Sequence, residues 1–250
     1  MNGENKILEI DALKKEIDKH RPLSDAALGQ LTNYYRIGLT YSSNALEGNS
    51  LTETETKVVI EDGITIGGKP LRDHYEAMGH SEAFTRLYSL AKKKIITGED
   101  ILGLHHLFYY RIDETRAGKY RKEKVIITGS SFVPPPPSQI AGLMEKFTSN
   151  IPKLRKKYHP VEFAAFLHKE LATIHPFIDG NGRTARLLMN LALLQTGYGI
   201  TIIPPVLRSE YINALKKAQT GTKASRPFIN FISGMVCESM KDCQRLLNAL

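Results

Sequence analysis

Hydrophobic residues recur along most of the chain at the spacing of amphipathic helices. Two long stretches, residues 161–174 and 184–196, have the apolar spacing of buried helices and flank a short polar turn. The predicted fold class is therefore mainly α, a helical bundle. The third predicted helix begins where Thr52 and Glu55 have the spacing of a capping box. The predicted helices are residues 5–20, 25–41, a third from 52, about 70–94, 99–110, 138–157, 159–174, 181–196, 208–219 and 227–250.

Residues 124–132 break the helical pattern. A β-branched run at 124–128 is followed by turn residues, and the four prolines at 134–137 would end any strand pairing. These features predict a short β-hairpin at about residues 120–137. A lone hairpin has unpaired edges to which an extended peptide can add, so it is either a clamp for a substrate or a surface excursion between helices. The residues that would contact such a peptide are Val125, Ile126, Ile127, Thr128 and Gly129.

The composition is that of a soluble globular protein. Of the 250 residues, 42% are hydrophobic and 24% are charged, and no apolar run approaches the length of a membrane span. The first twenty residues are charged and lack the apolar core of a secretory signal, so a cytoplasmic location is expected. Cys237 and Cys243 are six apart on a predicted helix and point to nearly opposite faces, which argues against a disulfide between them.

The chain is basic, with a net charge of +8. Its positive residues are scattered in short runs, and there is no zinc-ligand spacing or aromatic-basic signature of RNA binding. Nucleic acid is therefore not expected as a partner. Attraction to an anionic nucleotide or an acidic protein accounts for the charge equally well.

The turn between the two apolar helices has the chemistry of a phosphate site. Gly180 and Gly182 allow positive φ angles and close approach of a ligand, and Asn181 tolerates the left-handed region. A helix that begins near Asn181 would present unpaired N–H groups and its positive dipole end to an anion. Arg183 and Arg186 share a face in its first turn, where positive side chains oppose the dipole unless an anion binds there.

Two more residues of this segment supply candidate chemistry. His175 is able to accept a proton near neutral pH, as a general base for a hydroxyl nucleophile. Asp179 offers the single hard oxygen ligand that Mg²⁺ needs beside phosphate oxygens and water. A purely structural interpretation would make His175 a helix cap, Asp179 a turn former and both arginines surface residues.

The sequence HPFIDGNGRTAR at residues 175–186 resembles the signature of the Fic family, helical enzymes that transfer AMP from ATP to protein hydroxyl groups. Residues 117–121 and 125–130 resemble the family's flap, and residues 226–231 resemble its closing helix. The resemblance covers roughly residues 40–235. It implies a Fic-type helical bundle with a hairpin flap, ATP and Mg²⁺ or Mn²⁺ as cofactors, and a protein substrate, which could be the protein itself.

The same resemblance implies roles for the motif residues. His175 would be the base and Asp179 the metal ligand, residues 180–182 would form the anion hole for the α- and β-phosphates, and Arg183 and Arg186 would hold the outer phosphates. The attacking hydroxyl would displace pyrophosphate in line.

Further positions are compared with the family's other features. Tyr211 lies where the family's adenine pocket has a tyrosine, although an amphipathic helix could equally bury it as core. Gln219 stands where the family often has Asn. Phe177, apolar beside the turn, is expected to be a packing anchor. Some relatives are regulated by dimerisation, so a homodimer is one form to consider.

A second segment, SNALEGN at residues 43–49, resembles the inhibitory motif of many Fic enzymes. It contains Ser43 and Glu47, and the resemblance implies that Glu47 pairs with Arg186 and keeps ATP from binding productively. The other interpretation makes Glu47 an exposed helix-end residue before a glycine. The predicted organisation is an N-terminal helical region, 1–95, with this motif at about 40–50, and a catalytic core, 96–250.

Three other functions remain open. The same site could remove AMP from a modified protein, with Glu47 aligning a water. It could transfer another phosphate-containing group, although the kinase-like Doc branch departs at the second glycine of the turn and Gly182 is present here. It could also sense nucleotide without catalysis, as an interaction module or regulator, which would leave His175 unexplained.

Overall fold

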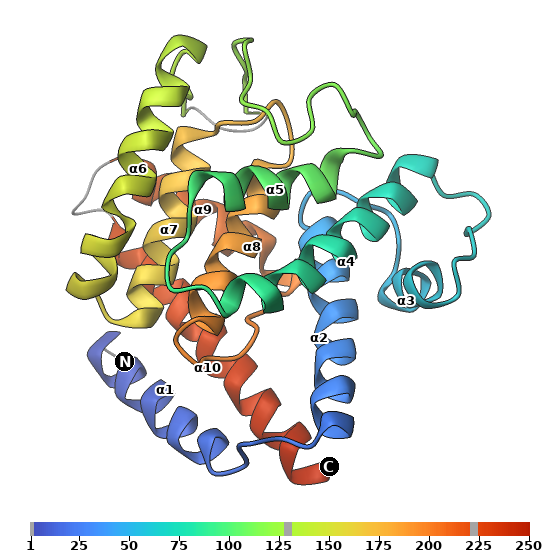
Figure 1. Ribbon diagram of the computed structural model, residues 1–250, viewed down its shortest axis with the longest axis vertical. Coiled ribbons are helices and arrows are strands. Elements are labelled where there is room, and N and C mark those ends of the chain that lie inside the picture. The colour runs from blue at the N-terminus through green and yellow to red at the C-terminus, as the bar shows by residue number, and fades with distance from the viewer. Residues whose placement is uncertain (1–2, 128–131, 221–224) are drawn as a thin grey trace.

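The computed structural model describes residues 3–127, 132–220 and 225–250. In these residues the chain forms a bundle of ten α-helices and one short 3-10 helix, which confirms the mainly α prediction (Figure 1). The elements are α1 (Gly3–Asp18), α2 (Asp25–Ala45), α3 (Glu53–Glu61), α4 (Leu71–Ala91), α5 (Gly98–Tyr109), α6 (Pro137–Lys157), α7 (Pro160–Ile174), α8 (Asn181–Leu194), η1 (Pro205–Leu207), α9 (Arg208–Gln219) and α10 (Arg226–Ala249).

The apolar helices α7 and α8 form the centre of the bundle. They pack against each other, α8 also contacts α4 and α5, and α10 packs against α1, α7 and α9 (Figure 1). One core extends from Ile10 in α1 to Leu247 in α10, so the predicted N-terminal region and the predicted catalytic core share hydrophobic contacts. The turn between α7 and α8 is therefore held by helices from both regions.

Local signals in the sequence account for several helix ends. Thr52 and Glu55 form the predicted capping box at the start of α3. Thr97 and Asp100 form a second one, at the start of α5. Both boxes satisfy backbone N–H groups that would otherwise lack partners in the first helical turn.

The predicted β-hairpin is not confirmed. The parts of the chain that the structure describes contain no β-strand, and residues 124–127 run without regular hydrogen-bonded pairing. Thr128 and Gly129 belong to residues 128–131, which lie outside the described residues. A β-branched run favours extended backbone, but a strand also needs a partner, and none of the described segments pairs with this one.

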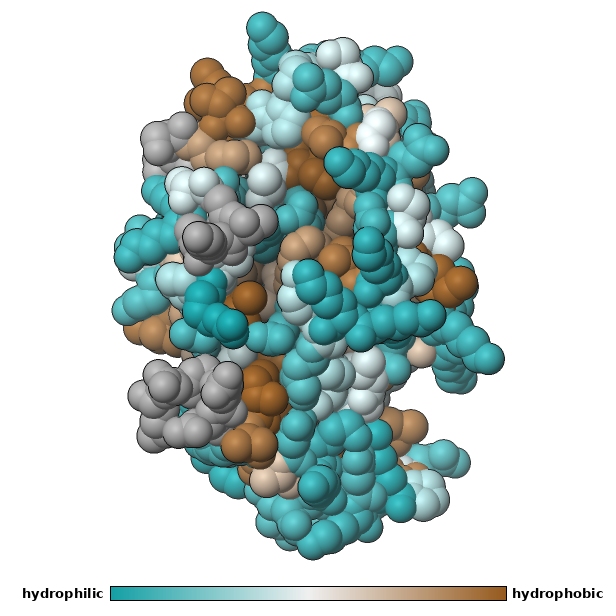
Figure 2. Space-filling view, turned by 90° about the vertical axis from the view of Figure 1, so that its left-hand side faces the viewer, coloured by the Kyte–Doolittle hydropathy of each residue, from teal (hydrophilic) through white to brown (hydrophobic). Residues whose placement is uncertain are grey.

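The surface and the cysteines add two observations. The face seen in Figure 2 is mainly hydrophilic, with hydrophobic residues in separate small groups. Cys237 and Cys243 are buried, and neither forms a disulfide bond.

Within the described residues, none of the helices combines the length and the apolar character needed to span a membrane.

Candidate active site

The turn between α7 and α8 is built from the predicted motif. α7 ends at Ile174 and is capped by His175, whose φ of 52° lies in the left-handed region and whose N–H donates to the Leu171 carbonyl. Gly180 has a φ of 76°, and a Cβ atom there would lie 2.5 Å from the ring of Phe108. Glycine at this position is therefore required by both backbone angle and space.

The side chains of the turn hold it together. Asn181, predicted to belong to the anion-binding turn, accepts a hydrogen bond from the N–H of Phe177 and donates one to its carbonyl, both at 2.9 Å. Phe177 is buried, as expected of a packing anchor, and stacks on His105 of α5 with ring centroids 3.8 Å apart. The turn is thus braced from within and from α5.

His105 is a residue of the site that the sequence did not reveal. Its Nδ1 accepts the N–H of Gly118, so its Nε2 carries the proton and donates to the Asp179 carbonyl at 3.1 Å. Burial lowers the pKa of His105 to about 4, so the ring is neutral at physiological pH. A histidine inside a predicted helix has no local signal that links it to a turn 74 residues away.

A pocket of about 470 Å³ opens at this turn and gathers most of the predicted site residues. Its volume is that of a small-molecule site. Of the predicted residues that the structure describes, the lining lacks Ser43, Arg183 and Arg186, which are buried, and Val125, which directly precedes the lining residue Ile126 in the chain. The lining residues are Glu47, Ile126, Ile127, Ala172, His175, Ile178, Asp179, Gly180, Asn181, Gly182, Arg208, Tyr211, Ile212, Leu215, Lys216 and Gln219.

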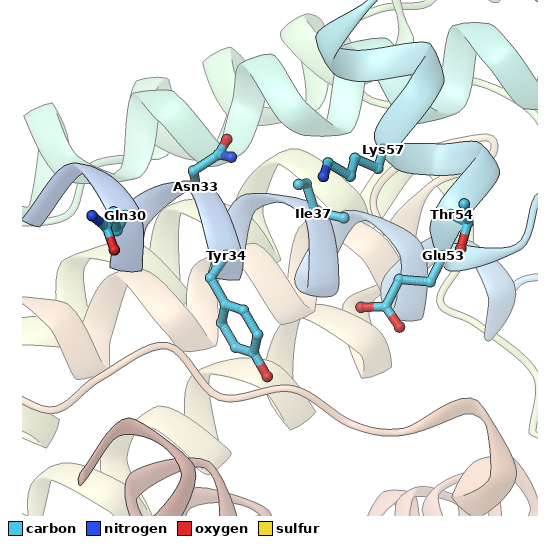
Figure 3. A pocket seen from close by; sticks show the side chains of 7 residues that line it. All are labelled: Gln30, Asn33, Tyr34, Ile37, Glu53, Thr54 and Lys57. Carbon is cyan, nitrogen blue, oxygen red and sulfur yellow. The ribbon is translucent and has the colours of Figure 1, made fainter. Parts of the chain in front are cut away.

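A second, more open pocket of about 580 Å³ lies between α2 and α3 (Figure 3). It contains none of the motif residues, and its charged side chains are a single carboxylate and a single ammonium group. The pocket at the turn is therefore the candidate active site. The lining residues of the second pocket are Gln30, Asn33, Tyr34, Ile37, Glu53, Thr54 and Lys57.

The general-base candidate has a defined tautomer. Nδ1 of His175 lies 3.3 Å from the Ala172 carbonyl, which only accepts, so Nδ1 carries the proton and Nε2 is left as the acceptor. Burial lowers the pKa of His175 below 6.5, and the positive charge of Arg121 lowers it further. The imidazole is therefore ready to take a proton at neutral pH.

Arg121 links His175 to the segment that resembles the flap. Its Nε donates to the His175 carbonyl at 2.8 Å, its Nη1 to the Glu123 carbonyl at 2.9 Å and its Nη2 to the Pro135 carbonyl at 2.6 Å. The side chain is buried, with 4% of its surface exposed. One guanidinium thus joins His175 to the residues on either side of segment 124–134.

The carboxylate of Asp179 lies at the mouth of the pocket with 40% of its side chain exposed. Its Oδ1 accepts the Gly180 N–H at 2.6 Å, and Arg72 of α4 lies against Oδ2. Burial alone would raise the pKa of Asp179, but Arg183, this N–H and Arg72 lower it by more, so the group is ionised. Asp179 fits a site for a cation, because its side chain is charged and accessible and the positive charge of Arg72 already lies against Oδ2.

The described residues contain no group of three or more His, Cys, Asp and Glu side chains that could hold a metal ion. Asp179 is therefore not part of such a group.

Arg183 is buried behind the turn and neutralised by a carboxylate from α4. Glu76 lies 2.9 Å from its Nη1, Asn44 and Asp179 lie 3.4 Å from its Nη1 and Nη2, and Phe108 stacks on its guanidinium at 4.2 Å. Glu76 also accepts a hydrogen bond from Asn49, within the predicted inhibitory motif. The sequence did not reveal Glu76, because a polar residue in a long helix gives no sign of a distant partner.

Arg186 makes four hydrogen bonds, three of them with the predicted inhibitory motif. Nε donates to Ser43 Oγ at 2.9 Å, Nη2 to the Ser43 carbonyl at 2.8 Å and to Glu47 Oε1 at 2.7 Å. Nη1 donates to the Tyr211 hydroxyl at 3.2 Å. Burial would raise the pKa of Glu47, but Arg186 and Arg183 together hold it below 4.5, so the pair is ionic.

Tyr211 and Gln219 lie on the α9 side of the pocket. The Tyr211 ring is 1% exposed and its hydroxyl faces Arg186, while the next residue, Ile212, also lines the pocket. The Gln219 amide donates to the Ala172 carbonyl at 3.4 Å, the same carbonyl that Nδ1 of His175 faces.

Comparisons with known proteins agree with this architecture. The Fic/DOC family model matches residues 95–193. A Fic domain containing signaling protein from Bacteroides thetaiotaomicron superposes with a TM-score of 0.88 at 28% identity, over 96% of this chain and 98% of that one. A variant of Fic-1 from C. elegans gives a TM-score of 0.85 at 30% identity, over 99% of this chain and 72% of that one.

The helical bundle and its motif turn define a Fic-type domain, and the chain belongs to the Fic/DOC family. Among curated proteins, "Protein adenylyltransferase Fic" from Drosophila willistoni is 40% identical over 195 residues, which are 77% of this chain. The same match covers 38% of that relative's length, so the chain spans about two fifths of it.

Proposed function

We propose that the protein is a protein adenylyltransferase, which transfers AMP from ATP to a hydroxyl group of a protein. The observation that carries the proposal is one pocket lined by a neutral His175, the carboxylate of Asp179 and the start of α8. The names of the Drosophila relatives support the same activity. Nucleotide binding alone would not need a histidine with a free acceptor nitrogen in this pocket.

In the proposed reaction, Nε2 of His175 takes the proton of the attacking Ser, Thr or Tyr hydroxyl. A bond forms between that oxygen and the α-phosphorus of ATP, the bond from the α-phosphorus to the bridging oxygen breaks, and pyrophosphate leaves. The N–H groups at the start of α8, around residues 180–182, would stabilise the phosphate charge, and Arg183 and Arg186 would balance the outer phosphates.

Asp179 is the residue that would hold Mg²⁺, or Mn²⁺ in its place, and the metal would supply charge neutralisation for the phosphates. Arg72 would have to give up its contact with Asp179 Oδ2 for this to happen. Residues 125–127, together with 128 and 129, would align the protein substrate.

The proposed resting state is self-inhibited. Glu47 occupies Nη2 of Arg186 and places a negative charge where an outer phosphate would bind. ATP would then lose one cation and meet like-charge repulsion, so that it binds weakly or in an unproductive pose.

The test uses Glu47→Gly and the double variant Glu47→Gly/His175→Ala with ATP labelled at the α- or the γ-phosphate. Adenylyl transfer predicts that the Glu47 variant incorporates only the α-label, into itself or into proteins of a lysate, with a mass increase of one AMP. The double variant should incorporate neither label. Incorporation of the γ-label would instead indicate phosphoryl transfer, and no incorporation by the Glu47 variant would contradict the proposal.

Removal of AMP is the second candidate, because Glu47 and His175 line the same pocket and the carboxylate could align a water there. A protein modified by the Glu47→Gly variant is the substrate for this test. Loss of AMP with wild-type protein, and none with Glu47→Gln, would favour removal. Equal loss with both proteins would exclude a role for Glu47 in it.

A further inference from the structure

Three buried side chains from three helices form a hydrogen-bonded chain that ends at Arg186. His168 of α7 lies 2.9 Å from the hydroxyl of Tyr211 of α9, and that hydroxyl lies 3.2 Å from Nη1 of Arg186. The three residues are 0%, 1% and 1% exposed. Only the arginine belongs to the phosphate motif.

The direction of each hydrogen bond follows from the chemistry of the groups. A guanidinium only donates, so the Tyr211 oxygen accepts from Arg186 and its single hydrogen is left for Nε2 of His168. That nitrogen must then be unprotonated. Burial, with the charge of Arg186, lowers the pKa of His168 to about 3, so the ring stays neutral and able to accept.

The chain holds the side of Arg186 that the inhibitory motif does not touch. Ser43 and Glu47 accept hydrogen bonds from Nε and Nη2, whereas Nη1 donates to Tyr211. Exchange of Glu47 for a phosphate oxygen would therefore leave the contact with Tyr211 and His168 intact. A guanidinium fixed on one edge presents its other edge in one orientation, which lowers the entropic cost of binding an anion.

We propose that Tyr211 and His168 are positioning residues that hold Arg186 toward the outer phosphates of a nucleoside triphosphate. The inference rests on the proposed function. It assigns these residues to discrimination between a triphosphate and a monophosphate, because Arg186 is the group they orient. This role does not require Tyr211 or His168 to contact the adenine of the nucleotide.

The substitution Tyr211→Phe isolates the hydroxyl. The ring packs beside Phe228 and Phe231, with centroids 6.3 and 6.0 Å away, and phenylalanine preserves this packing. For His168, glutamine keeps an acceptor near the position of Nε2 and leucine does not. These variants separate the hydrogen bond from the volume of each side chain.

The experiment measures ATP and AMP affinity by calorimetry in a Glu47→Gly background, with thermal unfolding as the check on folding. Tyr211→Phe and His168→Leu should weaken ATP binding about tenfold, as expected for a hydrogen bond to a charged group, and change AMP binding less than about twofold. His168→Gln should restore most of the ATP affinity. Tyr198→Phe, which removes a hydroxyl bonded to Asp11 far from the pocket, is the matched control.

Unchanged ATP affinity in Tyr211→Phe would overturn the proposal, as would an equal loss of ATP and AMP affinity. If His168→Leu fails to fold, Tyr211→Phe and His168→Gln still decide. Failure of the proposed function looks different, because the Glu47→Gly parent would then bind ATP without transferring AMP, or would bind no nucleotide at all.

Discussion

Oε1 of Glu47 lies 2.7 Å from Nη2 of Arg186, although 139 residues separate the two in the chain. The arginine side chain is 2% exposed and the glutamate side chain 36%, so the pair has one buried and one accessible partner. The accessible partner is the one that a ligand can displace without opening the core. This asymmetry suits a contact that is exchanged for a phosphate.

Replacement of Glu47 by glycine or glutamine should raise the rate of AMP transfer at least about tenfold, the factor that 1.4 kcal/mol represents. Both changes remove the negative charge that Glu47 places beside Arg186, and glycine also removes the acceptor of its hydrogen bond. Initial rates measured over ATP concentrations from well below saturation up to saturation give the effect on both kcat/KM and kcat. The control is Glu61→Gln, an α3 carboxylate that accepts a hydrogen bond from Asn33 away from the pocket. Rates equal to wild type for both Glu47 variants would contradict inhibition by this pair.

The pH dependence of transfer should follow His175. Burial lowers its pKa, as does Arg121, so the neutral base persists to lower pH than in free histidine. In the Glu47→Gly variant, kcat/KM should rise with pH through a midpoint below 6.5 and then level off. As pH falls, the histidine of the unfolded chain takes up its proton before the buried His175 of the folded protein does. The free energy of unfolding should therefore decrease as pH falls below 6.5.

Initial rates and thermal unfolding from about pH 5 to about pH 9 test both expectations. In the wild-type protein, the Glu47–Arg186 pair should not contribute to the loss of stability just below pH 6.5, because the pKa of Glu47 is held below 4.5 and its charge is lost only as pH falls through that lower value. A midpoint above 6.5 would mean that His175 is not the titrating base.

Most of the helices and the contiguous motif were predictable from the sequence. Apolar spacing predicts α7 and α8, and Gly180 and Asn181 are adjacent in the chain to the other residues of the turn that joins these helices. A turn whose parts are adjacent in the chain leaves a local signal. The residues that contact the motif from other helices leave no such signal. Glu76 pairs with Arg183, and His168 is linked to Arg186 through Tyr211, only because tertiary packing brings them together.

Tyr211 shows what a family pattern leaves open. The pattern predicts an adenine contact, and an amphipathic helix could equally bury the residue as core. In the structure the residue is 1% exposed, it lines the pocket beside Ile212, and its hydroxyl accepts a hydrogen bond from Arg186, while the adenine contact stays a prediction. Which face of a helix a residue occupies depends on how the helix is rotated against its neighbours, and the sequence of α9 alone leaves that open. The hairpin prediction had a similar limit, because strand pairing needs a partner.

Replacement of Arg121 by lysine should impair use of the protein substrate more than binding of ATP. A lysine ammonium cannot span the carbonyls of His175, Glu123 and Pro135, so the segment between them loses its anchor. We expect KM for a protein substrate to rise about tenfold, the loss of roughly one charged hydrogen bond. Lys122→Ala, an exposed cation beside it, is the control, and an equal rise in KM for ATP would argue against an anchor for the flap.

Two glycine-to-alanine changes should have opposite effects on stability. At Gly180, a φ of 76° and a contact of 2.5 Å with the ring of Phe108 leave no room for a Cβ atom. Gly180→Ala should lower the free energy of unfolding by about 2 kcal/mol or more, from left-handed backbone strain and overpacking together. Gly142 lies within α6, and nothing is found within 4 Å of an added Cβ. Gly142→Ala should raise stability by about 0.5–1 kcal/mol through helix propensity. Urea unfolding of both variants measures the difference, and a Gly180→Ala protein as stable as wild type would show that the turn tolerates a side chain.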